Sequence, residues 1–264
     1  MEWTGEAIIL GARRHGETDV ILEVMTAGRG RHLGLVRGGR SRRRQPTLQP
    51  GNEVQVTWRA RLADHLGVFT VDPIRSRAAG LMSSSLGLHG VQHLAGLLRL
   101  LPERDPHARL FDAFKVVLDH LDRFEIAGPL IIRFELELLN ELGFGLDLTA
   151  CAATGTRDDL AWVSPKSARA VSREAGEPYR DKLLALPPFL AEGQRQPGSE
   201  ITYQDLLNGF RLTDFFLHRN VYEPRGLKTG DLRAGLIAAL EKRYRAEFPW
   251  NFSTSAAEGS EPAP

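Results

Sequence analysis

The sequence contains a single cysteine and no long apolar run. One cysteine, Cys151, permits no internal disulfide and cannot hold a zinc ion by itself. No apolar stretch approaches the roughly 18 residues that a membrane helix needs. The first ten residues lack the basic and hydrophobic regions of a signal peptide. We therefore expect a cytosolic protein without structural disulfides and without a membrane partner.

Motifs for nucleotide binding and catalysis are also missing. No GxxxxGK[ST] phosphate loop is present, and the GxGxxG fingerprint fails because Gly28 and Gly30 are followed by Leu33. Neither HExxH nor GxSxG occurs. No histidine lies near Cys151 in the sequence, so a small buried thiol is a better interpretation than a nucleophile. We expect no catalytic residues, no cofactor and no enzyme activity.

Acidic residues and lysine are scarce at the N-terminal end. The first 79 residues hold 13 arginines, no lysine and 8 acidic residues, a formal balance of +5. The remaining residues hold 21 basic and 25 acidic side chains, a balance of −4. The stretch GRGRHLGLVRGGRSRRRQP, residues 28–46, contains seven arginines and no acid. This asymmetry, in a chain whose net charge is only +1, indicates a polyanionic partner for the basic part.

The arginines of this stretch are the candidate nucleic-acid-binding residues. A loop that is merely solvated usually mixes both signs of charge, and like charges at this density repel unless a polyanion neutralises them. Arginine grips phosphate through two hydrogen bonds and stacks on unpaired bases, although a genome rich in G and C also favours arginine codons. We favour nucleic-acid binding over a charged turn that only maintains solubility. The candidates are Arg29, Arg31, Arg37, Arg40, Arg42, Arg43 and Arg44.

The first 80 residues have the pattern of short strands. VQVTWRARL, residues 54–62, alternates strictly and places Val54 and Trp58 on one face. The apolar runs EAIILGARR, DVILEVMT and RHLGLVRG before it, and LGVFTV after it, bring the number of strands to five. Five strands without a long helix predict a small closed barrel of the OB type. Trp58 is more consistent with the core than with a stacking platform, whereas Trp3 and Phe69 stay undecided.

Helical periodicity begins near residue 80. Between residues 145 and 200 it weakens, and only SPKSARAVSREA, residues 164–175, suggests a short helix. The acidic, Pro-containing tail at 253–264 is predicted to be disordered. The fold class is therefore α+β: a nucleic-acid-binding barrel at 1–80, a helical domain at 81–252 with an irregular insertion at about 145–200, and the tail. The expected helices cover residues 80–101, 106–124, 129–145, 201–221 and 231–248.

The third of these helices has the clearest signals. Leu130 and Phe134 begin an apolar stripe that repeats every four residues, and Glu135 lies away from it. Pro129 suits the first turn of the helix, and Gly143 suits a C-terminal cap. We expect this helix to pack on its neighbours through the stripe.

Several segments resemble the bacterial RecO family of recombination mediators. HGETDVILEVMTAGRGRHLGLVRGGRSRRR and LQPGNEVQVTW resemble the family's opening, in which a barrel strand leads through GE.D.I to a G....L.KG.R turn and then to LQPG. FELELLNELGFGLDLTAC, AWVSPKSARAVS and LHRNVYEP match further on, in the same order and spacing. The motifs are short, but their order makes the resemblance specific, and it spans nearly the whole chain apart from the tail.

The resemblance implies an N-terminal OB fold, a helical C-terminal domain and a role in DNA repair and homologous recombination through the RecF pathway. Such proteins bind single- and double-stranded DNA and anneal complementary strands, including strands coated with single-strand-binding protein. With the partner RecR they help to load RecA recombinase. The family's basic surface maps onto the seven candidate arginines, and a nucleoid-associated, cytoplasmic protein is expected. A second basic patch, a candidate site for the acidic C-terminal tail of single-strand-binding protein, consists of Arg219, Arg225 and Lys228.

The sequence departs from the family at its zinc site. Many members hold zinc with two CxxC pairs, of which the first would begin at Cys151. Thr154 stands in the place of the second ligand, and Ser172 and Ala175 occupy the places of the other pair. One thiolate cannot assemble a tetrahedral site, so we expect no bound metal in this zinc-finger-like loop. Packing and hydrogen bonds must hold the loop instead.

Two other functions stay open from the residues alone. An OB-type RNA-binding factor in translation or ribosome assembly captures phosphate in the same way, because arginine does not read the 2′-hydroxyl unless a specific contact does. A protein-interaction module could use the helices and the second basic patch to hold an acidic peptide. The resemblance favours the recombination mediator and makes peptide binding an added role.

Overall fold

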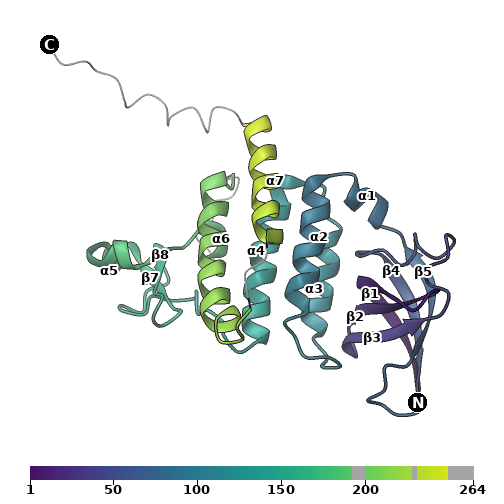
Figure 1. The fold of residues 1–264 in the computed structure, drawn as a ribbon. Coiled ribbons are helices and arrows are strands. Elements are labelled where there is room, and N and C mark those ends of the chain that lie inside the picture. The colour runs from purple at the N-terminus through teal and green to yellow at the C-terminus, as the bar shows by residue number, and fades with distance from the viewer. Residues whose placement is uncertain (192–199, 228–230, 249–264) are drawn as a thin grey trace.

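A barrel, a set of helices and a small second sheet follow one another across the molecule (Figure 1). The computed structural model describes residues 1–191, 200–227 and 231–248. The predicted α+β class is confirmed: the strands of the barrel come first, and the helices follow with a small second sheet between α4 and α6. The predicted disorder of 253–264 concerns residues outside the described ones. Within the described ranges, no helix combines the length and apolar character needed to cross a bilayer.

The N-terminal strands close into a barrel in the order β1-β2-β3-β5-β4. β3 and β5 close it in parallel at Leu35 and Val68, and the other neighbouring strands are antiparallel. This arrangement confirms the predicted five-stranded, OB-type architecture. The strands are β1 (Glu2–His15), β2 (Asp19–Thr26), β3 (Gly30–Val36), β4 (Glu53–Arg59) and β5 (Val68–Arg75).

The alternation predicted for β4 fills the barrel. Val54 and Trp58 point inward and are buried. β4 ends at Arg59, so the strand predicted to continue through residue 62 is too long, and Leu62 is 56% exposed in the loop before β5. Gly34 of β3 lies against Phe69, where a Cβ atom would come within 2.4 Å of the ring. A side chain at this position would therefore displace the barrel core.

The helical domain begins where the barrel ends. Ser84 divides the first predicted helix, because its hydroxyl accepts a hydrogen bond from the Gly87 N–H at 3.0 Å and caps a new helix. α4 begins at buried Phe124, so Pro129 lies inside the helix and the prediction of a first-turn proline is wrong. Gly143, with φ +84°, ends α4 as predicted. The long helices are α2 (Ser85–Leu98), α3 (Ala108–Leu118), α4 (Phe124–Glu141), α6 (Tyr203–Leu217) and α7 (Asp231–Glu247), after the short α1 (Ala78–Met82).

The region of weak periodicity folds into a second, smaller sheet in the order β7-β6-β8. The helix predicted at 164–175 is wrong for most of its length. Ala168 has φ +57°, a left-handed conformation that a right-handed helix does not contain, and only the last residues form a helical turn. The elements are β6 (Leu160–Val163), β7 (Ala170–Ser172), α5 (Arg173–Gly176), the 3₁₀ turn η1 (Glu177–Lys182), β8 (Leu184–Ala185) and the 3₁₀ turn η2 (Pro188–Leu190); a π-helical turn, η3 (His218–Tyr222), follows α6.

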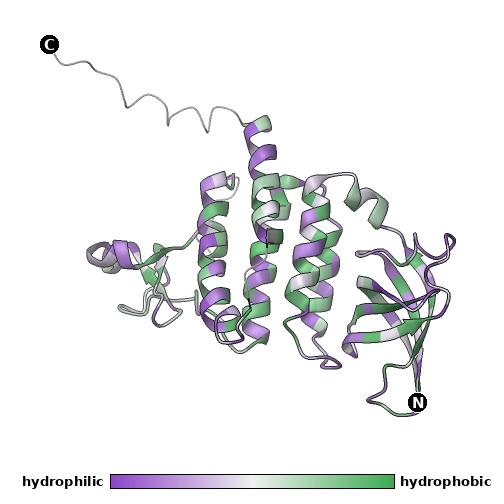
Figure 2. Cartoon of the chain, in the orientation of Figure 1, coloured by the Kyte–Doolittle hydropathy of each residue, from purple (hydrophilic) through white to green (hydrophobic). Residues whose placement is uncertain are grey.

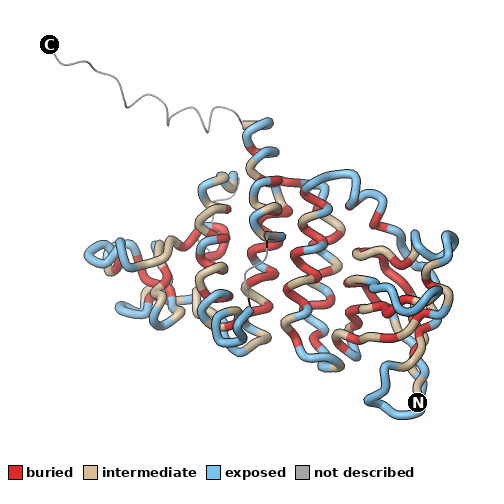
Figure 3. Tube along the Cα trace, viewed as in Figure 1, coloured by how far each residue is buried: buried red, intermediate tan, exposed pale blue. Residues whose placement is uncertain are grey.

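The barrel and the helices are joined by apolar packing and by charge. Ile8, Leu10 and Met25 on the outer side of the barrel belong to the core of the helical domain, whereas the inward-pointing residues form a separate barrel core. Figure 2 shows hydrophobic residues on both the strands and the helices, and Figure 3 shows that buried residues extend through both parts. At the same interface Glu53 of β4 forms a buried ion pair of 2.7 Å with Arg77.

Candidate nucleic-acid interface

Most of the candidate arginines lie on one loop, residues 37–44, which we call the arginine loop. Gly38, with φ +63°, turns the chain as it leaves β3, as expected for a glycine in this place. The loop rests on the β1–β2 hairpin: the Arg40 N–H donates to the Thr18 carbonyl at 2.9 Å, and the Gly38 N–H donates to Asp19 Oδ1 at 2.8 Å. The structure thereby brings together Arg37, Arg40, Arg42, Arg43 and Arg44.

The exposed arginines of this loop form no ion pair within the described residues, and Asp19 is the carboxylate whose charge interacts with one of them, Arg37. Arg37, Arg42 and Arg43 are exposed, and within the described part of the chain their guanidinium groups make no ion pair or hydrogen bond. Arg40 and Arg44 donate to backbone carbonyls of the hairpin and of the loop itself. Because carbonyls are neutral, these two arginines shape the loop and still add their charge to its surface.

The hairpin under the loop adds two cations that the sequence interpretation missed. Arg13 and Arg14 are exposed near the end of β1, opposite β2. Two acids, Glu17 and Asp19, accompany them at the hairpin. The hydrogen bond from the Gly38 N–H is the main cause that lowers the pKa of Asp19, so this carboxylate stays ionised and holds the loop. The pair of arginines just before HGET, residues 15–18, where the chain turns from β1 into β2, was the signal that could have identified this surface.

The other two candidate arginines lie apart from the loop. Arg31 Nη1 forms an ion pair with Glu23 at 2.8 Å, and its Nε donates to the Leu101 carbonyl at 3.3 Å. Its side chain is only 15% exposed, so Arg31 joins the barrel to the helical domain. Arg29 is exposed in the β2–β3 turn, at the opposite end of β3 from the arginine loop. The seven candidates therefore do not form one continuous patch.

The structure resolves the interpretation of the N-terminal aromatic residues. Trp58 and Phe69 are buried in the barrel core, which confirms the preference for a core role of Trp58. Trp3 is half-buried at the end of the barrel near Arg29. Only Trp3 of these three therefore keeps substantial contact with solvent.

The second basic patch is only partly described. Arg219 donates to the Pro165 carbonyl in the turn of the small sheet, and Arg225 donates to the Leu100 carbonyl after α2 at 2.7 Å. Both side chains are exposed, but their guanidinium groups contact different segments of the chain. Lys228, the third predicted member, lies outside the described residues.

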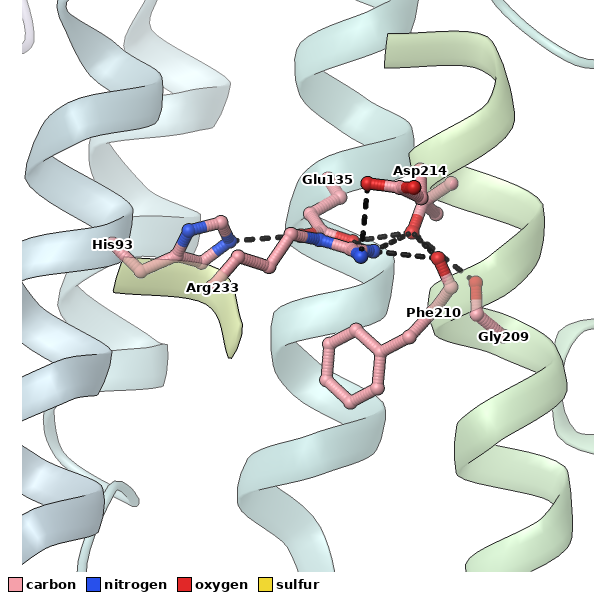
Figure 4. Close-up of polar contacts among 7 residues, drawn as sticks. His93, Glu135, Gly209, Phe210, Asp214 and Arg233 are labelled. Carbon is pink, nitrogen blue, oxygen red and sulfur yellow. Dashed lines mark hydrogen bonds and ion pairs between the residues drawn. The ribbon is translucent and has the colours of Figure 1, made fainter. Parts of the chain in front are cut away.

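A buried polar network joins four helices at the centre of the helical domain (Figure 4). Glu135 of α4 is completely buried, although it lies away from the apolar stripe of its helix. His93 Nε2 lies 2.8 Å from Glu135 Oε1, and Arg233 of α7 donates to both carboxylate oxygens at 3.0 and 3.1 Å. Thr213 of α6 donates to the same carboxylate. This network fixes α7 against α2, α4 and α6.

The zinc-finger-like loop is held by hydrogen bonds around Cys151. The N–H and hydroxyl of Ser172 donate to the buried Cys151 Sγ at 3.2 and 3.4 Å. Burial raises the pKa of this thiol, but hydrogen bonds from Ser172 and Thr154 outweigh burial and lower it to about 6. In the ranges that the structure describes, no three His, Cys, Asp or Glu side chains group as a metal site. One sulfur beside hydroxyl groups does not fit the tetrahedral ligand set of zinc.

Comparison with known proteins covers both parts of the chain. The family described as "Recombination protein O N terminal" matches residues 1–77, and "Recombination protein O C terminal" matches residues 88–229. A protein of Rhizobium etli named DNA repair protein RecO is 60% identical over 243 residues, 92% of this chain and 93% of that protein. The protein of the same name from Mesorhizobium japonicum is 59% identical, over 92% of this chain and 95% of that protein. The one from Sinorhizobium medicae is 56% identical, over 93% of this chain and 97% of that protein. The chain therefore belongs to the RecO family of recombination and DNA repair proteins.

Proposed function

We propose that this protein binds single- and double-stranded DNA and acts as a recombination mediator without catalytic chemistry. Its relatives indicate the broader role in DNA repair and recombination. The observation that supports the proposal is the arginine loop, whose exposed Arg37, Arg42 and Arg43 form no ion pair within the described residues and which rests on the hairpin that carries Arg13 and Arg14. Such a surface needs a polyanion to relieve its repulsion, and the guanidinium fork matches the geometry of phosphate.

Binding in this proposal is electrostatic capture of the sugar-phosphate backbone. Neutralising about four to six phosphates gives a salt slope of about −4 to −5, at roughly 0.9 per phosphate. The arginines of the loop and hairpin are numerous enough to make that many contacts. Affinity then falls steeply with salt and depends little on base sequence. Two strands held on this surface repel each other less, which favours annealing of complementary bases.

The proposed role also needs protein partners. The mediator binds RecR, helps to load RecA recombinase, and works in the cytoplasm at the nucleoid on strands coated with single-strand-binding protein. The acidic C-terminal tail of that protein is proposed to bind near Arg219 and Arg225, which are exposed after α6 beside Leu227, 45% exposed. Exposed cations beside an apolar side chain complement an acidic tail that ends in an aromatic residue.

The test is the rate at which two complementary oligonucleotides anneal when each is coated with single-strand-binding protein. The variant changes Arg37, Arg42 and Arg43 to Ala, because these arginines make no hydrogen bond that shapes the loop. Its matched control changes Arg173 and Arg180 to Ala. These two arginines are exposed, paired with carboxylates, and lie on α5 and η1 at the end of the molecule away from the barrel.

We expect wild type and the control to accelerate annealing and the loop variant to lose most of the acceleration. If none of the three proteins accelerates annealing, the mediator role is wrong. If the loop variant anneals as fast as wild type, the DNA-binding surface lies elsewhere. Competition with a matched RNA oligonucleotide separates the RNA-binding alternative, because a translation factor would prefer RNA and a recombination mediator would not.

A further inference from the structure

The end of the barrel opposite the arginine loop contains an open pocket of about 440 Å³. We call it the barrel mouth. Its size falls within the range of about 300–1,000 Å³ typical of small-ligand sites. The walls come from the start of β1, the turn before β3, the end of β4, and two loops that face one another. The residues lining it are Met1, Glu2, Trp3, Arg29, His32, Trp58, Ala63 and Arg104.

Aromatic rings form the floor of the barrel mouth. Trp3 stacks on Trp58 with ring centroids 6.2 Å apart and planes inclined by 23°. His32 meets both rings edge-on, at 5.2 Å from Trp3 and 5.1 Å from Trp58. Trp58 is fixed because its Nε1–H donates to the Leu66 carbonyl at 2.9 Å. Trp3 thus rests on a rigid aromatic base, and it is the half-buried ring that contacts the pocket.

Two cations without carboxylate partners stand at the barrel mouth. Arg29 is exposed and has no ion pair among the described residues. The Arg104 guanidinium lies 5.9 Å from the Trp58 ring centroid and donates to the carbonyls of Ala63 and His65, which are neutral. Among the described residues that line the pocket, Glu2 is the one acid, and it is paired with Arg59 at 2.8 Å. The electrostatics of the pocket therefore favour an anionic ligand.

The helical domain holds Arg104 in place. The backbone of Arg104 has φ +64°, a conformation uncommon for a residue with a side chain, and its N–H donates to the Arg31 carbonyl at 2.8 Å. The neighbouring backbone packs so closely against Gly30 that a Cβ there would come within 1.8 Å of the Asp105 carbonyl oxygen. One wall of the pocket is therefore built by a loop far from the barrel in sequence.

His32 is a buried, neutral member of the aromatic lining of the barrel mouth. Burial lowers the pKa of His32, and the charges of Arg104 and Arg29 lower it further, so the ring is neutral at physiological pH. Its Nδ1 lies 2.9 Å from the Leu33 carbonyl, to which it can only donate. The ring therefore adds no positive charge to the pocket, and its edge-on contacts hold Trp3 and Trp58 in place.

We propose that the barrel mouth binds one unpaired nucleobase of single-stranded DNA, stacked on Trp3, with the adjoining phosphate on Arg29. This inference rests on the proposed DNA binding. A nucleotide matches both features of the pocket, because it has a flat aromatic face for Trp3 and a negative charge for the cations. A base within a duplex is stacked on both sides and cannot enter. The pocket therefore distinguishes unpaired DNA from duplex, which phosphate capture alone does not.

The position of the pocket supports a continuous path for the strand. Arg29 precedes β3 and Arg37 follows it, and the seven residues of β3 span about 23 Å. A single strand that runs along the barrel can place phosphates on the arginine loop and a base in the barrel mouth at the same time. Flexible single-stranded DNA can adapt to both contacts.

The experiment compares two oligonucleotides of equal length with wild type and variants. One is oligo(dT), and the other has the same backbone with abasic sites replacing its central bases, so that the phosphates are equal in number. Binding is measured by fluorescence anisotropy at one salt concentration. We expect wild type to bind oligo(dT) about tenfold more tightly, which corresponds to about 1.4 kcal/mol and to one stacked base.

Three variants locate this preference. Trp3→Leu removes the stacking ring, and we expect the ratio of the two dissociation constants to fall close to one. Trp3→Phe keeps an aromatic face and should retain most of the preference. Ala63→Leu adds bulk at the pocket from an exposed loop position without altering the barrel core, so it tests the pocket even if Trp3→Leu does not fold. Circular dichroism checks the fold of each variant.

The outcomes separate this inference from the proposed function. If wild type binds neither oligonucleotide, DNA binding itself is wrong and the inference falls with it. If wild type binds both equally, DNA binding stands and the base pocket is refuted. If Ala63→Leu and a folded Trp3→Leu keep the tenfold preference, the bases bind at another site and the base pocket is also refuted. The proposal is supported if Trp3→Leu and Ala63→Leu lose the preference for oligo(dT) and Trp3→Phe retains it.

Discussion

Changing Glu135 to Gln tests the buried network that fixes α7. The change removes the negative charge from the centre of the helical domain. Among the described residues it leaves the Arg233 guanidinium, whose side chain is 11% exposed, with Asp214 as its one ionic partner. Breaking a buried ion pair on one side costs about 3–5 kcal/mol. Because the amide oxygen still accepts a hydrogen bond from Arg233, we expect a loss of about 3 kcal/mol. That is a large part of a typical total stability of about 5–15 kcal/mol.

The matched control changes Asp214 to Asn. Asp214 pairs with the same guanidinium at 3.1 Å, but its side chain is 46% exposed. Ion pairs in contact with water contribute about 0–1 kcal/mol, so the control should lose less than about 1 kcal/mol. Urea denaturation followed by circular dichroism gives the free energy of unfolding of each variant. The midpoint of Glu135→Gln should fall without a change in slope.

The lowered pKa of Glu135 predicts that the stability of the protein depends on pH. Burial alone raises the pKa of Glu135, but the charges and hydrogen bonds of Arg233 and His93 outweigh it and lower the pKa to about 2, from an ordinary value of 4.5. A lowered pKa contributes stability that is present above pH 4.5 and is lost as the pH falls toward 2. The loss amounts to about 3 kcal/mol. The free energy of unfolding of wild type should therefore fall more steeply between pH 4.5 and pH 2 than that of Glu135→Gln.

Two results would refute this reasoning. The first is a loss of less than about 1 kcal/mol on changing Glu135 to Gln at neutral pH, since the carboxylate would then not be a needed partner of Arg233. The second is an equal pH dependence for both proteins between pH 4.5 and 2. Either result would mean that water or rearrangement compensates the charge of Arg233.

Three further predictions concern the barrel and the zinc-finger-like loop. Changing Arg42 and Arg43 to Ala should reduce the steepness of the salt dependence of DNA binding by about 1.8, at roughly 0.9 per phosphate contact, and an unchanged slope in a salt titration would exclude these residues as phosphate contacts. Gly30→Ala should lower the thermal midpoint by several degrees, because φ is +61° and the new Cβ would collide with the Asp105 carbonyl; calorimetry measures the shift, and an unchanged midpoint would contradict the contact. Treatment with a chelator should leave the thermal midpoint unchanged, and metal analysis should find no stoichiometric zinc, because Cys151 has no group of partner ligands for a tetrahedral site among the residues that the structure describes; one zinc per chain would overturn this expectation.

Local patterns were sufficient to predict the barrel and the long helices. The inward side of β4 follows from strict alternation through Val54 and Trp58, because a strand presents every second residue to the same face. The end of α4 follows from Gly143, since only glycine adopts the required backbone conformation at little cost. Both signals lie within a few residues of the structure they determine.

Contacts distant in sequence account for what the patterns did not predict. Glu135 looks like a surface residue on its own helix, and only the arrival of Arg233 from α7, 98 residues later, makes its burial favourable. The predicted helix at 164–175 contains residues compatible with helix, but Ala170 and Val171 pair with β6 and are buried there. Tertiary packing overrides a weak local propensity in both places.

The sequence predicted which stretch carries the positive charge of the candidate interface. It did not predict which of those arginines lie together on the surface. Charge counting selected Arg31 because sequence does not show that its side chain pairs with Glu23, a diagonal neighbour on the adjacent strand β2. It passed over Arg13 and Arg14 because strand pairing, rather than sequence proximity, brings the hairpin beneath the arginine loop. The barrel mouth was beyond prediction, since Arg104 reaches it from the helical domain.

Residues on the outer side of the barrel belong to the core of the helical domain, so the protein cannot be cut into two independent domains without exposing them. The two family matches suggest a boundary after residue 77, but a fragment ending there would expose Ile8, Leu10 and Met25 to water. Each such side chain contributes about 1.5–3 kcal/mol when fully buried. The fragment would also lose Lys115 as a partner of Glu53. The barrel is therefore not a transferable module: truncation, gene fusion or evolutionary shuffling at this boundary requires a new apolar surface to replace the helices.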